Sequence, residues 1–334
     1  MSNALSQHPA YLPLQRVVKR NQLEKIQALR EELNDDPVRG LLADRGLRWA
    51  VKAGAVEAFV ELLEPEWGSD AARDVGSLQG GLLGEMIDLA EPNSLAEAHF
   101  PAFLKAAIAA GAPLESTDYV TVPLTKAIAS QREPLVKALL EAGADPNGLY
   151  RWSKNGMASF GFPPLLQSQS LSQVALFLEH GASRSARRAS MHEGVFGGVA
   201  DLLFKWPEAE LNELWATLRS HGVTLDTLVE SKNDELVPLG EALFARPMDP
   251  KYGPQMGVSA MRSSFLRTYE KTQARRWKLQ ELMVNHGLDL MAIGPHGRSW
   301  ASYVQEDGSP LLCRQLDLNR RLPSPAPRRK GPRF

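Results

Sequence analysis

The sequence predicts an all-α fold, a helical-hairpin solenoid in which short helix pairs stack along the chain. Paired segments place apolar residues three and four positions apart, which is the period of an amphipathic helix. Each pair ends at a glycine, and these closing glycines return at intervals near a common repeat length. The composition, 43% apolar and 23% charged, is that of an ordinary folded chain rather than of a disordered or fibrous one.

The clearest hairpin occupies residues 122–147. Its two halves carry apolar residues at helical spacing, first Leu124, Ala127 and Ile128 and then Leu135, Val136, Leu139 and Leu140. Pro123 suits the first turn of a helix, where a missing N–H costs little, and Gly143 suits the left-handed position just past a helix end. We therefore expect a helix, a tight turn and a second helix with a defined end.

This unit resembles the ankyrin repeat. It shares the Pro-Leu start, the Ala-rich first helix, the Val and Leu-Leu of the second helix, and the closing Gly-Ala-Asp with Asn shortly after. The family's Thr-Pro-Leu-His start is Val-Pro-Leu-Thr here, so hydrogen bonds that normally knit the repeat start are missing and we expect irregular hairpins. The resemblance implies a stack of helix pairs that binds another protein. A different helical-hairpin solenoid is the alternative fold.

The same template extends along the chain with lower fidelity. We expect about seven to eight repeats with insertions, at residues 11–40, 41–67, 80–118, 121–150, 162–186, 191–228, 236–293 and 297–318, after an N-terminal extension at residues 1–10. Gly111 and Gly143 are 32 residues apart, and the following intervals, which end at Gly181, Gly222 and Gly287, are 38, 41 and 65 residues long. Residues 319–334 are basic and proline-rich without an acid, so we expect a disordered tail.

Motifs for catalysis or cofactor binding are not recognisable in the sequence. The glycine clusters lack the lysine and the preceding strand of a phosphate-binding loop, and the histidines are too scattered for a metal site. His180, His221 and His286 each precede a closing glycine and should cap the last helical carbonyl groups. The apolar neighbours of Cys313, the single cysteine, should raise its thiol pKa. We expect no enzyme activity, no metal and no cofactor.

Charge and hydropathy bear on location and partners. No segment has the roughly 20 uninterrupted apolar residues of a membrane span, and no signal-peptide pattern is present, so we expect a cytoplasmic protein, monomeric by itself. Residues 1–145 contain 14 Lys and Arg against 21 Asp and Glu, whereas residues 146–334 contain 24 against 18. The basic second half, including the insertion at 246–278 and the tail, makes nucleic acid an alternative partner.

The inter-repeat loops hold the residues that we expect to contact a partner protein. Tyr150, Arg151, Trp152 and Lys154 follow the closing segment of the clearest repeat, and Asp118 and Tyr119 hold the equivalent position one repeat earlier. Arg184, Arg187 and Arg188 form a basic cluster on the next loop. Aromatic and arginine side chains often anchor interfaces. The alternative for Trp152 is packing over the neighbouring repeat. Trp206, Trp215 and Trp277 are expected in the core, and Trp300 fits either role.

These observations predict a protein-binding scaffold, inhibitor or regulator that uses the concave face and the inter-repeat loops of the array. The partner is another protein, which the sequence does not identify. An immunity protein, an injected effector of bacterial type and a regulatory subunit all fit the pattern. A nucleic-acid-associated protein is the first alternative, and an enzyme with a site across the long insertions is the second.

Overall fold

The computed structural model describes residues 5–69, 81–115, 123–148, 152–154, 157–159, 163–185, 198–230, 236–244, 273–294 and 297–321. The regular structure in these residues is helical apart from short antiparallel strand pairs, which confirms the predicted all-α fold. The chain divides into two compact units. Unit 1 comprises Met1–Ser183 and Arg188–His192, and unit 2 comprises Arg184–Arg187 and Glu193–Phe334.

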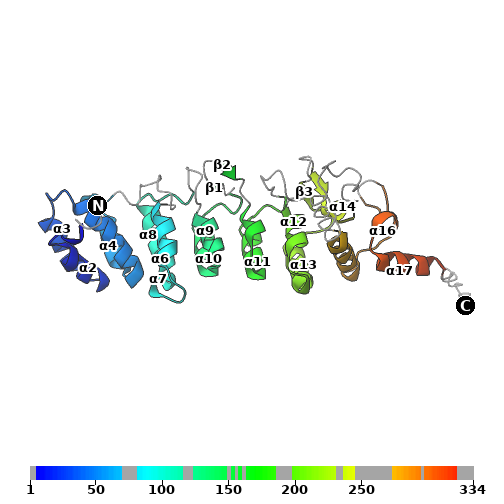
Figure 1. Cartoon of the computed structure of the whole chain (residues 1–334), viewed down its shortest axis with the longest axis horizontal. Coiled ribbons are helices and arrows are strands. Elements are labelled where there is room, and N and C mark those ends of the chain that lie inside the picture. Colours follow the sequence, from blue (N-terminus) through cyan, green and yellow to red (C-terminus); the bar gives the residue numbers. More distant parts are fainter. Residues whose placement is uncertain are drawn as a thin grey trace, which may run out of the picture. The chain divides into compact units, whose positions relative to one another are not determined.

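Unit 1 consists of two layers of helices. The first helix of each hairpin packs against the first helix of the next hairpin, and the second helices do the same. The first-helix layer contains α2 (Tyr11–Lys19), α4 (Arg39–Ala53), α6 (Gly81–Leu89), α9 (Pro123–Ala129) and the 3-10 helix η2 (Pro164–Gln167). The second-helix layer contains α3 (Leu23–Glu32), α5 (Val56–Leu62), α8 (Phe100–Ala109) and α10 (Glu133–Glu141), and α11 (Leu171–Glu179) pairs with η2. Figure 1 shows these helices side by side in chain order, coloured from blue to green.

The core of unit 1 lies between the two layers. All the apolar residues predicted to be buried in the clearest hairpin are buried, namely Leu124, Ala127, Ile128, Leu135, Val136, Leu139 and Leu140. Aromatic pairs join neighbouring hairpins. The rings of Tyr11 and Trp49 meet edge to face at 4.9 Å between α2 and α4, and those of Phe59 and Phe103 do so at 5.0 Å between α5 and α8.

The hairpins of unit 1 are irregular, as the missing repeat-start residues predict. A short 3-10 helix, η1 (Pro65–Trp67), follows α5, and an additional helix, α7 (Leu95–Ala98), precedes α8. The hydroxyl of Ser94, the N-cap of α7, accepts the N–H of Glu97, and the Glu97 carboxylate accepts the N–H of Asn93, so the start of α7 resembles a capping box with the return bond shifted by one residue. In the hairpin at 162–186 the first helix is reduced to the single 3-10 turn η2.

Each predicted closing glycine ends a helix in the same way. Gly111, Gly143, Gly181, Gly222 and Gly287 all have positive φ, between 77° and 98°. After each glycine, the next N–H bonds back to the carbonyl five residues earlier, in the pairs Ala112 to Ala107, Ala144 to Leu139, Ala182 to Phe177, Val223 to Leu218 and Leu288 to Met283. Glycine tolerates this left-handed backbone, and the long bond satisfies a carbonyl that the helix leaves unpaired.

Unit 2 continues the hairpin pattern with longer connections. Its elements are α12 (Gly198–Lys205), η3 (Glu208–Glu210), α13 (Leu211–Ser220), β3 (Leu228–Glu230), β4 (Leu236–Pro238), α14 (Leu239–Phe244), a helix over 273–285, α16 (Trp300–Asp307) and α17 (Pro310–Arg321). The first helices α12, α14 and α16 pack in sequence, and α16 packs on α17. α17 reaches Arg321 and so includes the start of the segment assigned to the tail; the rest of that segment lies outside the described residues.

The tryptophans of unit 2 lie mostly in its core. Trp206 and Trp215 are buried, as predicted. Trp300, for which the sequence left two roles open, is also buried and stacks near Phe244 with ring centroids 5.2 Å apart. Trp277 is half-buried. Because helices such as α14 and α16 are short, the large rings of these tryptophans provide much of the buried apolar area of unit 2.

Candidate protein-binding surface

Most of the loop residues predicted to contact a partner lie outside the described residues. This holds for Asp118, Tyr119, Tyr150, Arg151, Arg187 and Arg188. Trp152 and Lys154 lie on β1 (Trp152–Lys154), whose backbone pairs with β2 (Met157–Ser159) in an antiparallel hairpin with Trp152 opposite Ser159. The backbone therefore presents these two residues on a hairpin that follows the closing Gly143, and their role as contacts stays a prediction.

Arg184, the remaining predicted contact, has a partner within unit 2. Its guanidinium donates to the backbone carbonyl of Gly222 at 3.3 Å and to that of His221. These carbonyls follow the end of α13, where the helix leaves oxygen atoms without an internal donor. A basic side chain at this position satisfies them and interacts favourably with the helix dipole. Arg184 thus links its loop to the next hairpin by hydrogen bonds, although its side chain remains exposed.

Similar hydrogen bonds, each from a side chain of one closing loop to the backbone of the next, join the closing loops of unit 1. We call these bonds inter-repeat stitches. Glu115, four residues after Gly111, accepts the backbone N–H of Asp145 at 2.8 Å. Asn147, four residues after Gly143, accepts the N–H of Ser183 at 2.6 Å and donates to the carbonyl of Gly181 at 3.2 Å. In both cases the acceptor bonds to the residue two positions after the next closing glycine. These bonds hold successive loops in register without the repeat-start residues that the chain lacks.

The histidines before the closing glycines divide into two groups. His180 Nδ1 bonds to the carbonyl of Leu176 at 2.9 Å, and His221 Nδ1 bonds to that of Thr217 at 2.8 Å, which confirms the predicted capping role. The same prediction was wrong for His286, whose Nε2 instead lies 3.3 Å from the side-chain oxygen of Asn212 on α13. The contact between neighbouring helices competes with the local cap at this position.

Two loops of unit 2 expose large apolar side chains. We call the described residues of these loops finger A (223–230 and 236–238, with β3 and β4) and finger B (288–294 and 297–299). Leu228 and Leu236 on finger A are 48% and 55% exposed, and Met291 and Ile293 on finger B are 69% and 73% exposed. Among the described residues of unit 2, the one other large apolar side chain of this exposure is Leu311 on α17. The exposed apolar side chains of unit 2 therefore concentrate on the fingers.

Hydrogen bonds hold both fingers in a defined shape. Finger A closes through Leu239 N–H to Thr227 O at 2.7 Å and the β3–β4 register, which pairs Glu230 with Leu236. On the opposite side of that hairpin Val229 is buried, so the alternation of the strand leaves Leu228 facing solvent. Finger B closes through Gly294 N–H to Arg298 O at 2.8 Å.

Trp300 joins the bases of the two fingers. A Cβ at Gly240, directly after finger A, would lie 2.5 Å from its ring, and one at Gly294, on finger B, would lie 3.1 Å from it. The ring therefore packs against both backbones because these positions lack side chains. A buried tryptophan in this place fixes the spacing of the two fingers, so their exposed apolar side chains are presented by a preformed support.

The basic side chains described in unit 2 are largely engaged within the unit. Arg275 donates to the carbonyls of Leu203, at 2.7 Å, and Trp206 at the end of α12, and burial lowers its pKa against the opposing effect of Glu208. Lys278 pairs with Glu208 at 3.2 Å. Arg298 pairs with Glu306 and lies over the ring of Tyr303, 4.5 Å from its centroid. In the described part of the unit, these charges serve the fold, which gives the nucleic-acid alternative no further support.

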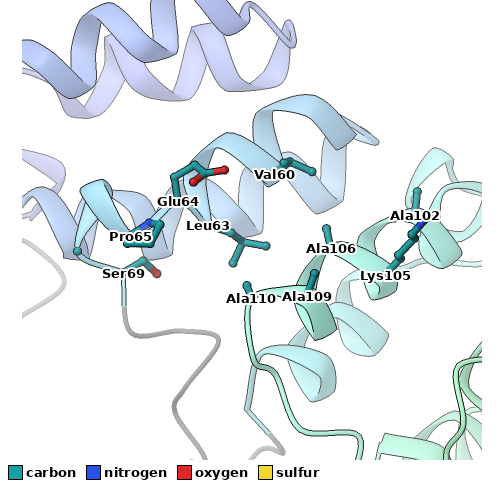
Figure 2. A pocket seen from close by; sticks show the side chains of 11 residues that line it. Val60, Leu63, Glu64, Pro65, Ser69, Ala102, Lys105, Ala106, Ala109 and Ala110 are labelled. Atoms are coloured by element: carbon teal, nitrogen blue, oxygen red, sulfur yellow. The ribbon is translucent and has the colours of Figure 1, made fainter.

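A groove of about 680 Å³ lies between α5 and α8 of unit 1 (Figure 2). Val60 and Leu63 line one side, and a row of alanines on α8 lines the other, at positions 102, 106 and 109, continued by Ala110. Glu64 and Lys105 are its charged lining residues. The lining has the character of a surface for apolar side chains, because it contains no histidine or cysteine and a single carboxylate.

The described side chains include no group of three or more His, Cys, Asp or Glu that could hold a metal ion. Burial, with a smaller contribution from Asp317, raises the pKa of the Cys313 thiol, which donates to the carbonyl of Val304 at 3.1 Å. This direction agrees with the apolar context expected from the sequence. No helix in the described part of the chain is both long and apolar enough to cross a membrane.

Comparisons with known proteins return solved structures alone. Neither a family model nor a curated protein matches the sequence. The fold is similar to the ankyrin repeat domain of Bcl-3, a member of the IkappaB protein family, with a TM-score of 0.43, 21% identity, and coverage of 67% of this chain and 91% of that one. It is also similar to the ankyrin repeat domain of human ASB11, with a TM-score of 0.40, 16% identity, and coverage of 79% and 97%. On the geometry of its stacked hairpins and closing glycines, the chain is an ankyrin-like helical repeat protein.

Proposed function

We propose that the chain is a protein-binding scaffold, acting as an inhibitor or regulator of its partner, and that fingers A and B are a main contact surface. The observation that carries this proposal is the concentration of exposed apolar side chains on the two fingers, at Leu228, Leu236, Met291 and Ile293. Large apolar side chains gathered on the same loops of a folded surface are typical of protein interaction sites. The β1–β2 hairpin with Trp152 is a further contact in the same proposal.

The physical advantage of this arrangement is its rigidity. The fingers are closed by backbone hydrogen bonds and share Trp300 as a support, so little conformational freedom remains to be lost on binding. The exposed leucine, isoleucine and methionine side chains of the fingers can enter apolar pockets of a partner and lose contact with water. A partner with a concave apolar surface fits this geometry.

The test compares two variants of unit 2 that carry aspartate at exposed apolar positions. The first carries Ile293→Asp on finger B, and the matched control carries Leu311→Asp on α17. We expect wild type and control to recover the same specific protein in quantitative affinity purification, and the finger variant to recover roughly tenfold less or none. Equal melting temperatures of the three proteins show that the loss is not unfolding. Equal recovery by the finger variant, or no specific protein with wild type, would overturn the proposal.

A further inference from the structure

The first two hairpins of unit 1 separate their charges between the two helix layers. Their first helices, α2 with the following Arg20 and α4, contain seven Lys and Arg and a single Asp. Their second helices, α3 and α5 with residues 63–67, contain seven Glu against two Lys and Arg. The positive layer lies in the half of the chain that is acidic as a whole, so it does not follow from bulk composition.

Most of the cations on the positive layer are not neutralised by the fold. Arg48 pairs with Glu85 on α6 at 2.6 Å, and the single acid, Asp44, is half-buried and accepts a hydrogen bond from Ser69. Arg39 is half-buried and donates to the side-chain oxygen of Asn34 at 2.9 Å. The other five cations are exposed and form no ion pair with described residues, namely Arg16, Lys19, Arg20, Arg45 and Lys52. The next first helix, α6, contains no Lys or Arg, and its Asp88 pairs with Lys126 of α9 at 2.6 Å. The unpaired positive charge of this layer therefore ends before α6.

These cations form a stripe together with exposed leucines. On α4, residues Leu41, Arg45, Arg48 and Lys52 recur at spacings of four, three and four, which places them along one exposed side of the helix. Leu12 and Lys19 lie on the exposed side of α2. We call these six residues the basic stripe. Leu12 and Leu41 are 54% and 52% exposed, so the stripe is apolar as well as positive.

The two helices present the stripe in register. α2 ends before Asn21 and α4 ends before Gly54, both with positive φ, 54° and 70°. Lys19 and Lys52 each stand two positions before that residue, and the two helices pack directly against each other. Lysines from successive repeats therefore occupy equivalent positions on neighbouring helices. From Leu41 to Lys52 the stripe is about 16 Å long, which about five residues of an extended peptide would span.

We propose that the basic stripe docks an acidic protein segment that also carries large apolar side chains. Carboxylates of the segment pair with Lys19, Arg45 and Lys52, and its apolar side chains contact Leu12 and Leu41. A peptide is favoured over a nucleic acid because the exposed leucines offer nothing to a phosphate backbone, whereas they can contact apolar side chains of a peptide. This surface lies in unit 1 and is independent of the fingers, so the two proposals can fail separately.

The experiment measures fluorescence anisotropy of three labelled probes with the full chain. The first probe is a synthetic peptide of about ten residues that alternates Glu and Leu, the second has each Glu replaced by Gln, and the third is a single-stranded DNA of similar length. The stripe variant carries Arg45→Glu and Lys52→Glu. The control carries Lys25→Glu and Lys105→Glu, which are exposed on the second-helix layer and change the net charge equally. A third variant, Leu41→Ser, tests the apolar contact.

We expect the Glu-Leu peptide to bind wild type and control with affinities within about twofold, and the stripe variant to bind it roughly tenfold more weakly. The Gln peptide should bind weakly to all, and Leu41→Ser should weaken binding of the Glu-Leu peptide severalfold. Tighter binding of the DNA than of the peptide would replace the proposed partner with a nucleic acid. Equal loss in the stripe and control variants would show a general charge effect, and absence of peptide binding to wild type at low salt would also overturn the proposal.

Discussion

Replacing Asn147 with alanine should destabilise unit 1 through the loss of one inter-repeat stitch. The side-chain oxygen of Asn147 accepts the N–H of Ser183 at 2.6 Å, and its amide nitrogen donates to the carbonyl of Gly181 at 3.2 Å. The first bond involves a half-buried residue and should contribute about 1 kcal/mol, whereas the second is longer and exposed and should contribute about 0.5 kcal/mol. The expected decrease in the free energy of unfolding is therefore about 1 to 2 kcal/mol.

The assay combines urea unfolding with native-state hydrogen exchange. Urea unfolding gives the free-energy difference between wild type and Asn147→Ala. Hydrogen exchange supplies an internal control, because the amide of Ser183 depends on Asn147, whereas the neighbouring amide of Ala182 bonds to Phe177 O at 2.9 Å. In the variant the Ser183 amide should exchange faster relative to Ala182. Unchanged relative protection of Ser183, or a destabilisation below about 0.3 kcal/mol, would refute the assignment of Asn147 as a stitch.

Gly54→Ala should lower the free energy of unfolding by about 2 to 4 kcal/mol, because φ is +70° and the new Cβ would lie 2.6 Å from Leu95 Cβ. Gly111→Ala, with φ +98° and open space around the new Cβ, should lower it by about 1 kcal/mol in the same urea assay. Burial raises the pKa of Glu115 against the opposing hydrogen bond from the Asp145 N–H, and repulsion from the Asp145 carboxylate adds to the increase, so the folded state holds the proton of Glu115 more tightly than the unfolded chain. Wild type should therefore lose stability relative to Glu115→Gln as pH rises from acid to neutral, and parallel stability curves would contradict this. Trp152→Ala should weaken partner binding by about 2 kcal/mol with little change in melting temperature, and a lower melting temperature with unchanged affinity would instead place Trp152 over the neighbouring repeat.

The repeated hairpin could be predicted from the sequence because its signals are local. Apolar residues such as Leu124 and Leu139 show the helical period within a few positions, and Gly143 marks a backbone conformation that other residues avoid. The closing glycines and the capping roles of His180 and His221 depend on neighbours in the same turn. Such features need no knowledge of the stack.

Contacts between repeats could not be predicted in the same way. Glu115 meets the backbone of Asp145, and Arg184 meets the carbonyls of His221 and Gly222, across a full repeat. The residue type of Arg184 suggested an interface, but its register relative to α13 decides its partner. His286 failed as a cap for the same reason, since Asn212 lies on the adjacent helix. The sequence contains these residues, but their pairing depends on how the hairpins stack.

The exposed apolar residues of the fingers were missed because their pattern has two interpretations. Leu236-Val237-Pro238 precedes Leu239 and matches the Pro-Leu start of a repeat, which suggested a helix start rather than a strand. Alternation of Leu228, Val229 and Glu230 was the available signal for a half-buried strand. Three residues are too few to distinguish it from the end of the preceding repeat.

The side chains without a structural role are the ones that can change to recognise a partner. In a solenoid each hairpin contacts only its neighbours, so a side chain that neither fills the core nor stitches two loops has no structural duty. Leu228 and Leu236 of finger A and Ile293 of finger B belong to this class, as do Lys19 and Lys52 of the basic stripe. Their replacement should leave folding nearly unchanged, whereas replacing Asn147 or Gly54 should not. Separating variants by this criterion therefore distinguishes residues that recognise a partner from residues that hold the array together.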